Sequence, residues 1–201
     1  MKFVENLEEL HALYGRPGAA ALRKVAAKLT PEYREWILRS RFCVLSTVGP
    51  DGSDGTPRGD DGPVIVELDE HTLAMPDWRG NNRIDSLRNI VCDPRVSLMF
   101  MIAGSNNVVR VNGCARVCCD PDMLIRFEQK GQNPRSVIVV RINEIYSQCA
   151  RALIRSGLWS MGDQSEGLPT VGQILAALTD GDVGGQAYDD EWTGRAAKTM
   201  W

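Results

Sequence analysis

Long apolar runs are missing from the 201-residue sequence. None approaches the roughly 20 residues that a helix needs to cross a membrane. The first nine residues also lack the apolar core of a signal peptide. We therefore expect a cytoplasmic protein with no membrane partner.

Histidine is scarce, and no cysteine pair has metal-ligand spacing. The chain has two histidines and six cysteines, and no two cysteines form a Cys-X-X-Cys pair. Structural and catalytic zinc sites depend on such clusters. We expect reduced thiols and no metal site.

An excess of basic residues is also absent. The formal net charge is -3 and the isoelectric point is about 5.5, whereas a protein that neutralises a phosphate backbone needs a basic excess. We therefore expect no nucleic-acid partner. The sequence contains neither GxxxxGK[ST], nor GxGxxG, nor GxSxG. The absence of these motifs argues against a P-loop nucleotide-binding protein, a Rossmann dinucleotide-binding protein and a hydrolase with a catalytic triad.

The pattern of apolar residues divides the chain into three regions. Residues 1–40 have helical spacing and are expected to pack on the next region as a helical segment. Residues 41–159 alternate in short runs typical of strands, and residues 160–201 are expected to form a helical tail. At this length one domain with appended terminal segments is favoured.

Six strands are predicted in the middle region, at 42–48, 64–68, 72–75, 96–103, 108–117 and 136–146. Residues 51–55 are expected to be a turn, and residues 56–63 a polar loop. Because parallel strands need long crossovers, the short connections favour an antiparallel sheet closed into a barrel.

The segment from Asp77 to Asp85 holds two arginines, two amides and a glycine between a strand and a helix. Free backbone N–H groups at a helix start attract anions, and Arg79 and Arg83 are spaced to lie on one helix face. The segment therefore suits a phosphate. An equally simple interpretation is a solvated helix start whose arginines pair with Asp77 and Asp85.

Three further polar segments are informative only in combination. Arg58 lies in a loop rich in proline and glycine, which by itself is most simply a connection. Arg110 and Asn112 share one face of an apolar strand, which alone indicates an exposed sheet face. The segment Arg151–Trp159 is a basic helix end, which the helix dipole favours in any case.

Taken in order, these segments resemble one family. The residues that carry the resemblance are Phe42–Gly52, Thr56–Asp60, Arg79–Ile90, Asp93–Val96, Leu98, Phe100 and Arg110–Gly113. Together they resemble the FMN-binding split-barrel family related to pyridoxamine 5'-phosphate oxidase, over about Pro31–Trp159. The likeness is greatest to a bacterial subgroup with PRGD, GNNR, RVNG and RSxLW motifs, the last matched by Arg155–Trp159.

The resemblance implies a fold, an assembly and a cofactor. The fold is mainly β with flanking helices, a six-stranded antiparallel split barrel of Greek-key type. The assembly is a homodimer with one FMN in each of two clefts at the subunit interface. One departure is that Gln148 stands before Cys149 where the subgroup often has histidine, so a proton-transfer role there is not supported.

The resemblance also implies roles for particular residues. Arg58, Asn82 and Arg83 would hold the phosphate and ribityl chain. Met75, Pro76 and Asp77 would run along the isoalloxazine edge. Arg110 and Asn112 would reach in from the partner subunit. Three other motif residues are assigned to cofactor binding: Arg79, Asn81 and Trp159.

The expected function is that of an FMN-dependent oxidoreductase. It would transfer hydride between FMN and a reduced nicotinamide or small organic substrate, the flavin carrying the chemistry. No catalytic residue is assigned. The alternatives are a non-catalytic flavin or haem carrier and an oxidoreductase that uses the deazaflavin coenzyme.

Overall fold

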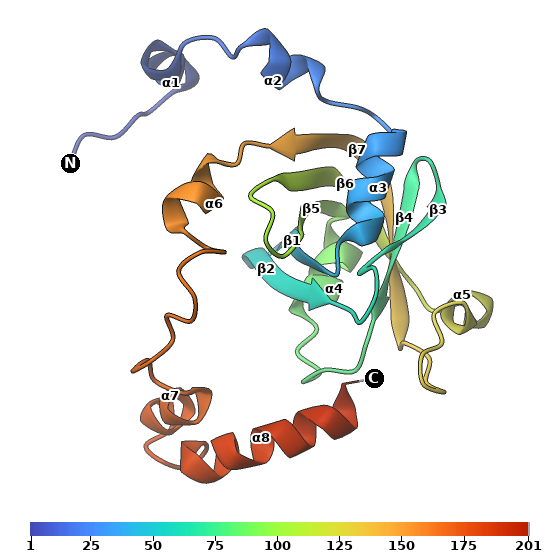
Figure 1. The fold of residues 1–201 in the computed structure, drawn as a ribbon, viewed down its shortest axis with the longest axis vertical. Helices are drawn as coiled ribbons and strands as arrows, with labels where there is room; N and C mark the ends of the chain where they lie inside the picture. Colours follow the sequence, from blue (N-terminus) through green and yellow to red (C-terminus); the bar gives the residue numbers. More distant parts are fainter. Residues whose placement is uncertain (201) are drawn as a thin grey trace.

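One antiparallel β-sheet organises the computed structural model, which describes residues 1–200 (Figure 1). Its seven strands follow the order β2-β1-β5-β6-β7-β4-β3. The strands are β1 (Phe42–Gly49), β2 (Gly52–Gly59), β3 (Val66–Asp69), β4 (Thr72–Asp77), β5 (Arg95–Met101), β6 (Val108–Cys118) and β7 (Ser136–Gln148). Trp201, the last residue of the predicted tail, lies outside the described residues.

The predicted fold class is right in outline and wrong in its strand count and closure. Antiparallel strands with flanking helices are confirmed. The sheet has seven strands rather than six, and β2 and β3 lie at opposite ends of the strand order. Within residues 1–200 no ladder joins these two ends, so the sheet is open rather than a closed barrel.

Strand β2 is the element that sequence patterns missed, because its sequence GSDGTPRG has little strand propensity. Pairing with β1 overrides that preference, in a register that runs from Gly49 opposite Gly52 to Phe42 opposite Gly59. As an edge strand, β2 tolerates Pro57, which cannot donate a ladder hydrogen bond.

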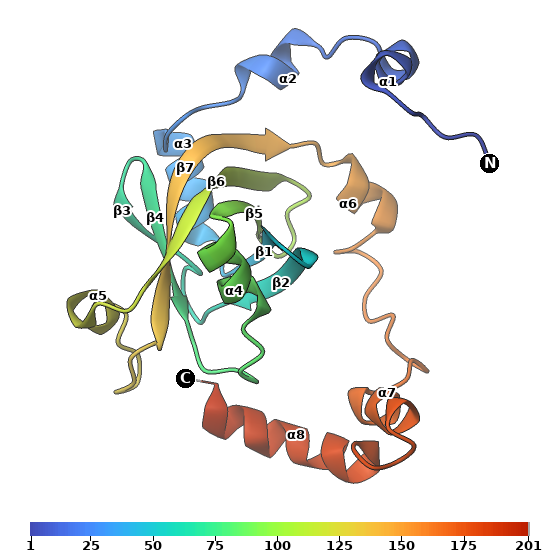
Figure 2. The ribbon, with the colours of Figure 1, turned by 180° about the vertical axis from the view of Figure 1, so that it is seen from behind.

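The core lies on the inner face of the curved sheet, and two helices complete it. Helix α3 (Pro31–Arg39) starts where predicted, with the Thr30 hydroxyl accepting from the Tyr33 N–H at 3.3 Å. Helix α4 (Asp85–Cys92) packs on β1, as the view from behind shows (Figure 2). Ile37 of α3 and Ile90 of α4 join the same buried cluster as Phe100.

A bulge between β6 and β7 explains the glycine of the RVNG motif. The register shifts after Asn112, which faces Glu144, so that Gly113 faces Ile142. A Cβ atom on Gly113 would lie 2.1 Å from the carbonyl oxygen of Arg141. Only glycine allows this close backbone approach.

The helices of the terminal segments contribute few side chains to the hydrophobic core. The remaining helices are α1 (Leu7–Tyr14), α2 (Ala19–Arg23), α5 (Pro121–Ile125), α6 (Arg151–Ser156), α7 (Val171–Leu178) and α8 (Gly185–Thr199). Neither α1 nor α2 buries a side chain. The chain joins the sheet at Ala26, which exchanges two backbone hydrogen bonds with Ile145 at 2.9 and 2.8 Å.

Helices α7 and α8 form a hairpin of their own. The Asp189 carboxylate accepts from the Thr170 hydroxyl at 2.5 Å and from the Gly172 N–H at 2.9 Å. Among residues 1–200, no helix has the length and apolar character required to traverse a bilayer.

Candidate functional site

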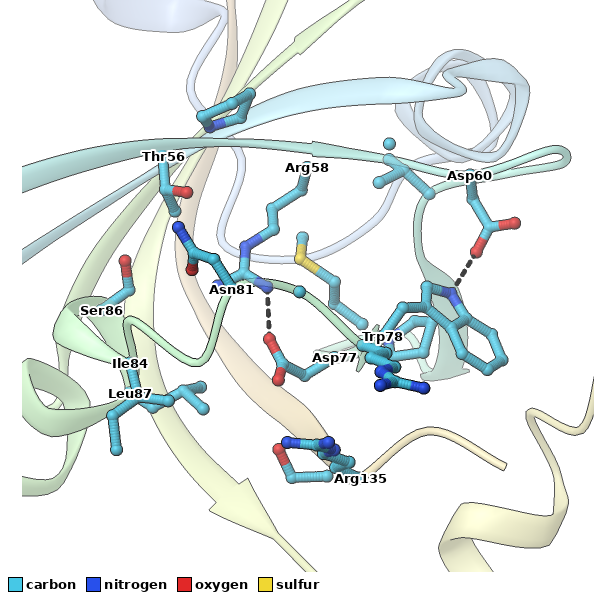
Figure 3. A pocket seen from close by; sticks show the side chains of 18 of the residues that line it. Thr56, Arg58, Asp60, Asp77, Trp78, Asn81, Ile84, Ser86, Leu87 and Arg135 are labelled. Carbon is cyan, nitrogen blue, oxygen red and sulfur yellow. Dashed lines mark hydrogen bonds and ion pairs between the residues drawn. The ribbon is translucent and has the colours of Figure 1, made fainter. Parts of the chain in front are cut away.

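A pocket of about 940 Å³ opens between β2, the end of β4 and the loop that leads into α4 (Figure 3). It brings together most of the residues that the sequence assigned to cofactor binding. Those that line it are Arg58, Met75, Pro76, Asp77, Arg79, Asn81, Asn82 and Arg83. Residues from β2, from β4 and from the following loop thus converge on one cavity.

Arg58 and Asp77 form an ion pair at the centre of the pocket (Figure 3). Their side chains are only 19% and 16% exposed. The Nε atom of Arg58 is buried and has no hydrogen-bond partner within residues 1–200. Because buried donors are nearly always satisfied, this atom marks a place for an acceptor from outside the chain.

Cys43 lies opposite Arg58 in the ladder between β1 and β2. Burial raises the pKa of its thiol to about 12, although the charge of Arg58 acts in the other direction. The thiol stays protonated at neutral pH, so Cys43 is a core residue and not a nucleophile.

The loop before α4 is irregular, which corrects the expectation that Arg79 and Arg83 share a helix face. The helix begins only at Asp85, and Asn82 has a left-handed backbone with φ of 60°. The Asn81 side-chain oxygen accepts from the Arg83 N–H at 3.0 Å and closes a tight turn. This turn sets the arginines in a loop that faces the pocket.

The alternative interpretation, a solvated helix start whose arginines pair with Asp77 and Asp85, is correct in part. Arg83 pairs with Asp85 at 2.5 Å, and this hydrogen bond raises the pKa of the Arg83 guanidinium above its usual value. Asp77, however, pairs with Arg58 and not with Arg79. Within residues 1–200 Arg79 has no acidic partner.

The charges that line the pocket favour an anion. Its five carboxylates all have partners already, three of them arginines and two of them neutral donors. Six cationic side chains face them: Arg41, Arg58, Arg79, Arg83, Lys130 and Arg135. Arg135 bonds to the neutral Asn82 oxygen at 2.6 Å. The first turn of α4 adds backbone N–H groups with no side-chain cap.

Asp60, Trp78, Lys130 and Arg135 are pocket residues that the sequence-based assignment omitted. Arg135 reaches the pocket because β4 pairs with β7, with Asp77 opposite Ser136. No local motif reveals that register. Asp60 ends the Thr56–Asp60 motif segment, and Trp78 belongs to the polar segment from Asp77 to Asp85. Only the folded structure shows that the Trp78 indole N–H donates to the Asp60 carboxylate at 2.8 Å.

Three predicted cofactor residues lie elsewhere. Arg110 lies on the outer face of β6, its guanidinium 5.4 Å from the centre of the Tyr146 ring. Asn112, on the same face, donates to Glu144 at 2.7 Å. The Trp159 indole donates to the Ser105 carbonyl at 2.8 Å. None of the three lines the pocket formed by residues 1–200.

Residues 29–149 match the family model described as pyridoxamine 5'-phosphate oxidase. The chain therefore belongs to the pyridoxamine 5'-phosphate oxidase family, which confirms the resemblance drawn from its motifs. All the predicted cofactor residues except Trp159 fall within the matched segment. No curated protein matched the sequence.

Several solved structures are similar to about three fifths of the chain. HupZ of Group A Streptococcus is 14% identical, with 59% of this chain and 93% of that chain covered and a TM-score of 0.49. A protein of the pyridoxamine 5'-phosphate oxidase type from Lactobacillus delbrueckii is 25% identical, with 60% and 95% covered and a TM-score of 0.47. The FAD binding protein from Mycobacterium smegmatis is 15% identical, with 61% and 97% covered and a TM-score of 0.41.

Proposed function

We propose that the protein is an FMN-binding oxidoreductase. It would transfer hydride between FMN and a reduced nicotinamide or a small organic substrate. The observation that carries this proposal is the pocket in which the family's motif residues surround a buried arginine with an unsatisfied donor. When bound, FMN supplies the hydride-accepting centre, and the protein supplies orientation and electrostatics.

The phosphate end of FMN fits the cationic loop before α4. Arg79 and Arg83 carry the charge, and the start of α4 adds backbone donors. Arg135 joins this loop by donating to the Asn82 side-chain oxygen. Arginine guanidinium groups form charge-assisted hydrogen bonds to phosphate oxygens. The buried Nε of Arg58 would take its acceptor from the phosphate or the ribityl chain.

The ring end of FMN fits the last residues of β4. Met75 and Pro76 are buried and give the pocket an apolar wall, and Asp77 closes it through its pair with Arg58. The volume lies within the range of about 300–1,000 Å³ that is usual for small-molecule sites. No residue is assigned as a catalytic acid or base.

We further propose a homodimer in which FMN binds between subunits. Arg110 and Asn112 lie on the outer sheet face, away from the pocket of their own chain. In a dimer whose interface includes this face, both side chains would approach the pocket of the partner. Trp159 would belong to the same shared site.

The alternative cofactors differ in what they require. Haem needs an axial ligand, usually histidine, cysteine, methionine or tyrosine. Two methionines, Met75 and Met200, line the pocket, but no histidine, cysteine or tyrosine of residues 1–200 does. Methionine serves as an axial haem ligand together with histidine, so this lining disfavours haem. A non-catalytic flavin carrier and a deazaflavin enzyme would use the same anion site, and the visible spectrum of the bound cofactor together with turnover of a nicotinamide donor separates them.

An FMN titration of matched arginine variants tests the proposal. Arg83→Ala removes a cation from the pocket, whereas Arg88→Ala removes an exposed cation from α4 outside it. Loss of a charge-assisted hydrogen bond to phosphate should raise the Kd for FMN roughly ten- to a hundredfold in the first variant. The second should retain the wild-type Kd.

Two outcomes would contradict the proposal. A wild-type protein that binds no FMN in an absorbance titration would remove the proposed function. Equal dissociation constants for the two variants would remove the phosphate assignment and leave flavin binding itself intact.

A further inference from the structure

The Asp60 carboxylate lies at one end of the pocket, where it faces Trp78 (Figure 3). Its Oδ2 atom accepts from the indole N–H of Trp78 at 2.8 Å. Its Oδ1 atom accepts from the Gln129 side chain at 3.0 Å and from the Asp61 N–H at 2.7 Å. The end of β2, the end of β4 and the turn after α5 therefore meet at one side chain.

These contacts orient neighbouring groups and do not neutralise charge. All three donors are neutral, and within residues 1–200 no cation forms an ion pair with Asp60. The carboxylate holds two oxygens in fixed directions, and an indole has a single donor. The bond from Trp78 to Asp60 thus selects one orientation of the indole ring.

Trp78 occupies a position where ring orientation matters. It follows directly after Asp77, and both residues line the pocket beside the wall formed by Met75 and Pro76. Trp78 is half-buried at the edge of the pocket. A flat aromatic ligand gains from an offset or edge contact with an aromatic ring only when that ring is held in place.

We infer that Asp60 is a positioning residue that holds the Trp78 ring as the aromatic wall of the flavin site. This inference rests on the proposed FMN function. Asp60 acts on the site through its hydrogen bond from the indole N–H. Gln129 and the Asp61 N–H fix the carboxylate in turn, so that it cannot rotate away from Trp78.

A double-mutant cycle with fluorescence detection tests the inference. The variants are Asp60→Ala, Trp78→Phe and the combination of both. Bound FMN is expected to be quenched in the wild type, because an indole in contact with a flavin quenches its emission. Asp60→Ala should increase the emission of bound FMN and raise its Kd roughly two- to tenfold, the effect of one lost orienting hydrogen bond.

The combined variant shows whether Asp60 affects FMN emission and Kd through Trp78. If Asp60 acts through Trp78, adding Asp60→Ala to Trp78→Phe should change neither emission nor Kd further, so that the two effects are not additive. Asp60→Asn should restore only part of the quenching. Its amide oxygen can accept from the indole, and the Gln129 amide can reverse to match the NH₂ group, but that NH₂ group then faces a second donor, the Asp61 N–H.

Asp120→Ala is the matched control. Asp120 caps α5 by accepting from the Asp122 N–H at 2.9 Å, close in sequence to Gln129 and outside the pocket. Its loss disturbs the segment that carries Gln129 without removing a bond to Trp78. Quenching and Kd should remain at their wild-type values.

The possible failures are distinguishable. Absence of FMN binding by the wild type would count against the proposed function. With binding intact, unchanged emission in Trp78→Phe would overturn the inference even if Asp60→Ala failed to fold. Additive effects in the combined variant, or equal changes in Asp120→Ala, would also overturn it.

Discussion

The two faces of strands β1, β5 and β6 differ in what completes them. On the inner face Leu45, Leu98 and Phe100 are fully buried, and helices of the same chain close the core. On the outer face Met99 and Arg110 stay half-buried. The inner face of the sheet is therefore buried by helices of the same chain. The outer face keeps apolar and cationic groups that suit a second subunit, which is where our dimer proposal places them.

The largest expected difference between the faces is in stability. Phe100→Ala empties a buried position and should lower the free energy of unfolding by about 3–5 kcal/mol. The neighbouring Met99→Ala alters the outer face and should change it by only about 0.5 kcal/mol in the monomer. Urea denaturation at low protein concentration measures both. Equal losses would show that the outer face belongs to the core of a single chain.

A smaller effect is expected from the coupling between FMN and the dimer. If the cofactor binds only between subunits, FMN at 100 times its Kd should stabilise each site by about 2.7 kcal/mol. Light scattering over a dilution series, with and without FMN, should then show the dimer persisting to lower concentration when FMN is present. A monomer that keeps stoichiometric flavin would contradict the shared site.

Arg110→Ala tests whether the outer face of the sheet contributes to the coupling between FMN and the dimer. Arg110 should supply a contact to the partner's flavin, so its loss should weaken the effect of FMN on dimerisation. Arg116 lies further along the same face of β6 and is exposed, which makes Arg116→Ala the control. If both variants respond to FMN alike, the contribution of Arg110 is not specific.

The inner face was predictable because it follows local rules. Alternating apolar residues located six of the strands, and Thr30 with Pro31 marked the start of α3. Family motifs then identified eight of the residues around the pocket. Long-range pairing was not predictable. Strand β2 forms against its local preference, and Arg135 enters the pocket through the register of β4 and β7.

The outer face shows a different limit. The sequence placed Arg110 and Asn112 on one face, and the structure agrees that both are half-buried beside buried Val111. It also gives Asn112 an acidic neighbour, Glu144, from a strand distant in sequence. Strand periodicity predicts which face a side chain takes, whereas its neighbour across the sheet depends on pairing.

The smallest expected effect concerns an ion pair that belongs to neither face. Arg34 of α3 holds Glu67 of β3 through two hydrogen bonds, at 2.6 and 2.8 Å. These bonds lower the pKa of Glu67 below its ordinary value of 4.5, since they favour the ionised carboxylate. The unfolded chain therefore binds the proton more readily than the folded chain. The pair's stabilisation is complete above about pH 4.5 and decreases as the pH falls through the lower folded pKa.

Arg34→Met should consequently be less stable than the wild type at about pH 7, and the difference between the two proteins should shrink in acid. Urea unfolding at several pH values measures that difference. The comparison is needed because Asp69 and Asp93 also have lowered pKa values that do not depend on Arg34 and affect both proteins equally. Glu67→Gln removes the titrating group and should show the same small loss at neutral pH. If the difference in unfolding free energy between Arg34→Met and the wild type stays constant down to about pH 3, the hydrogen bonds from Arg34 to Glu67 do not stabilise the packing of α3 on the edge of the sheet.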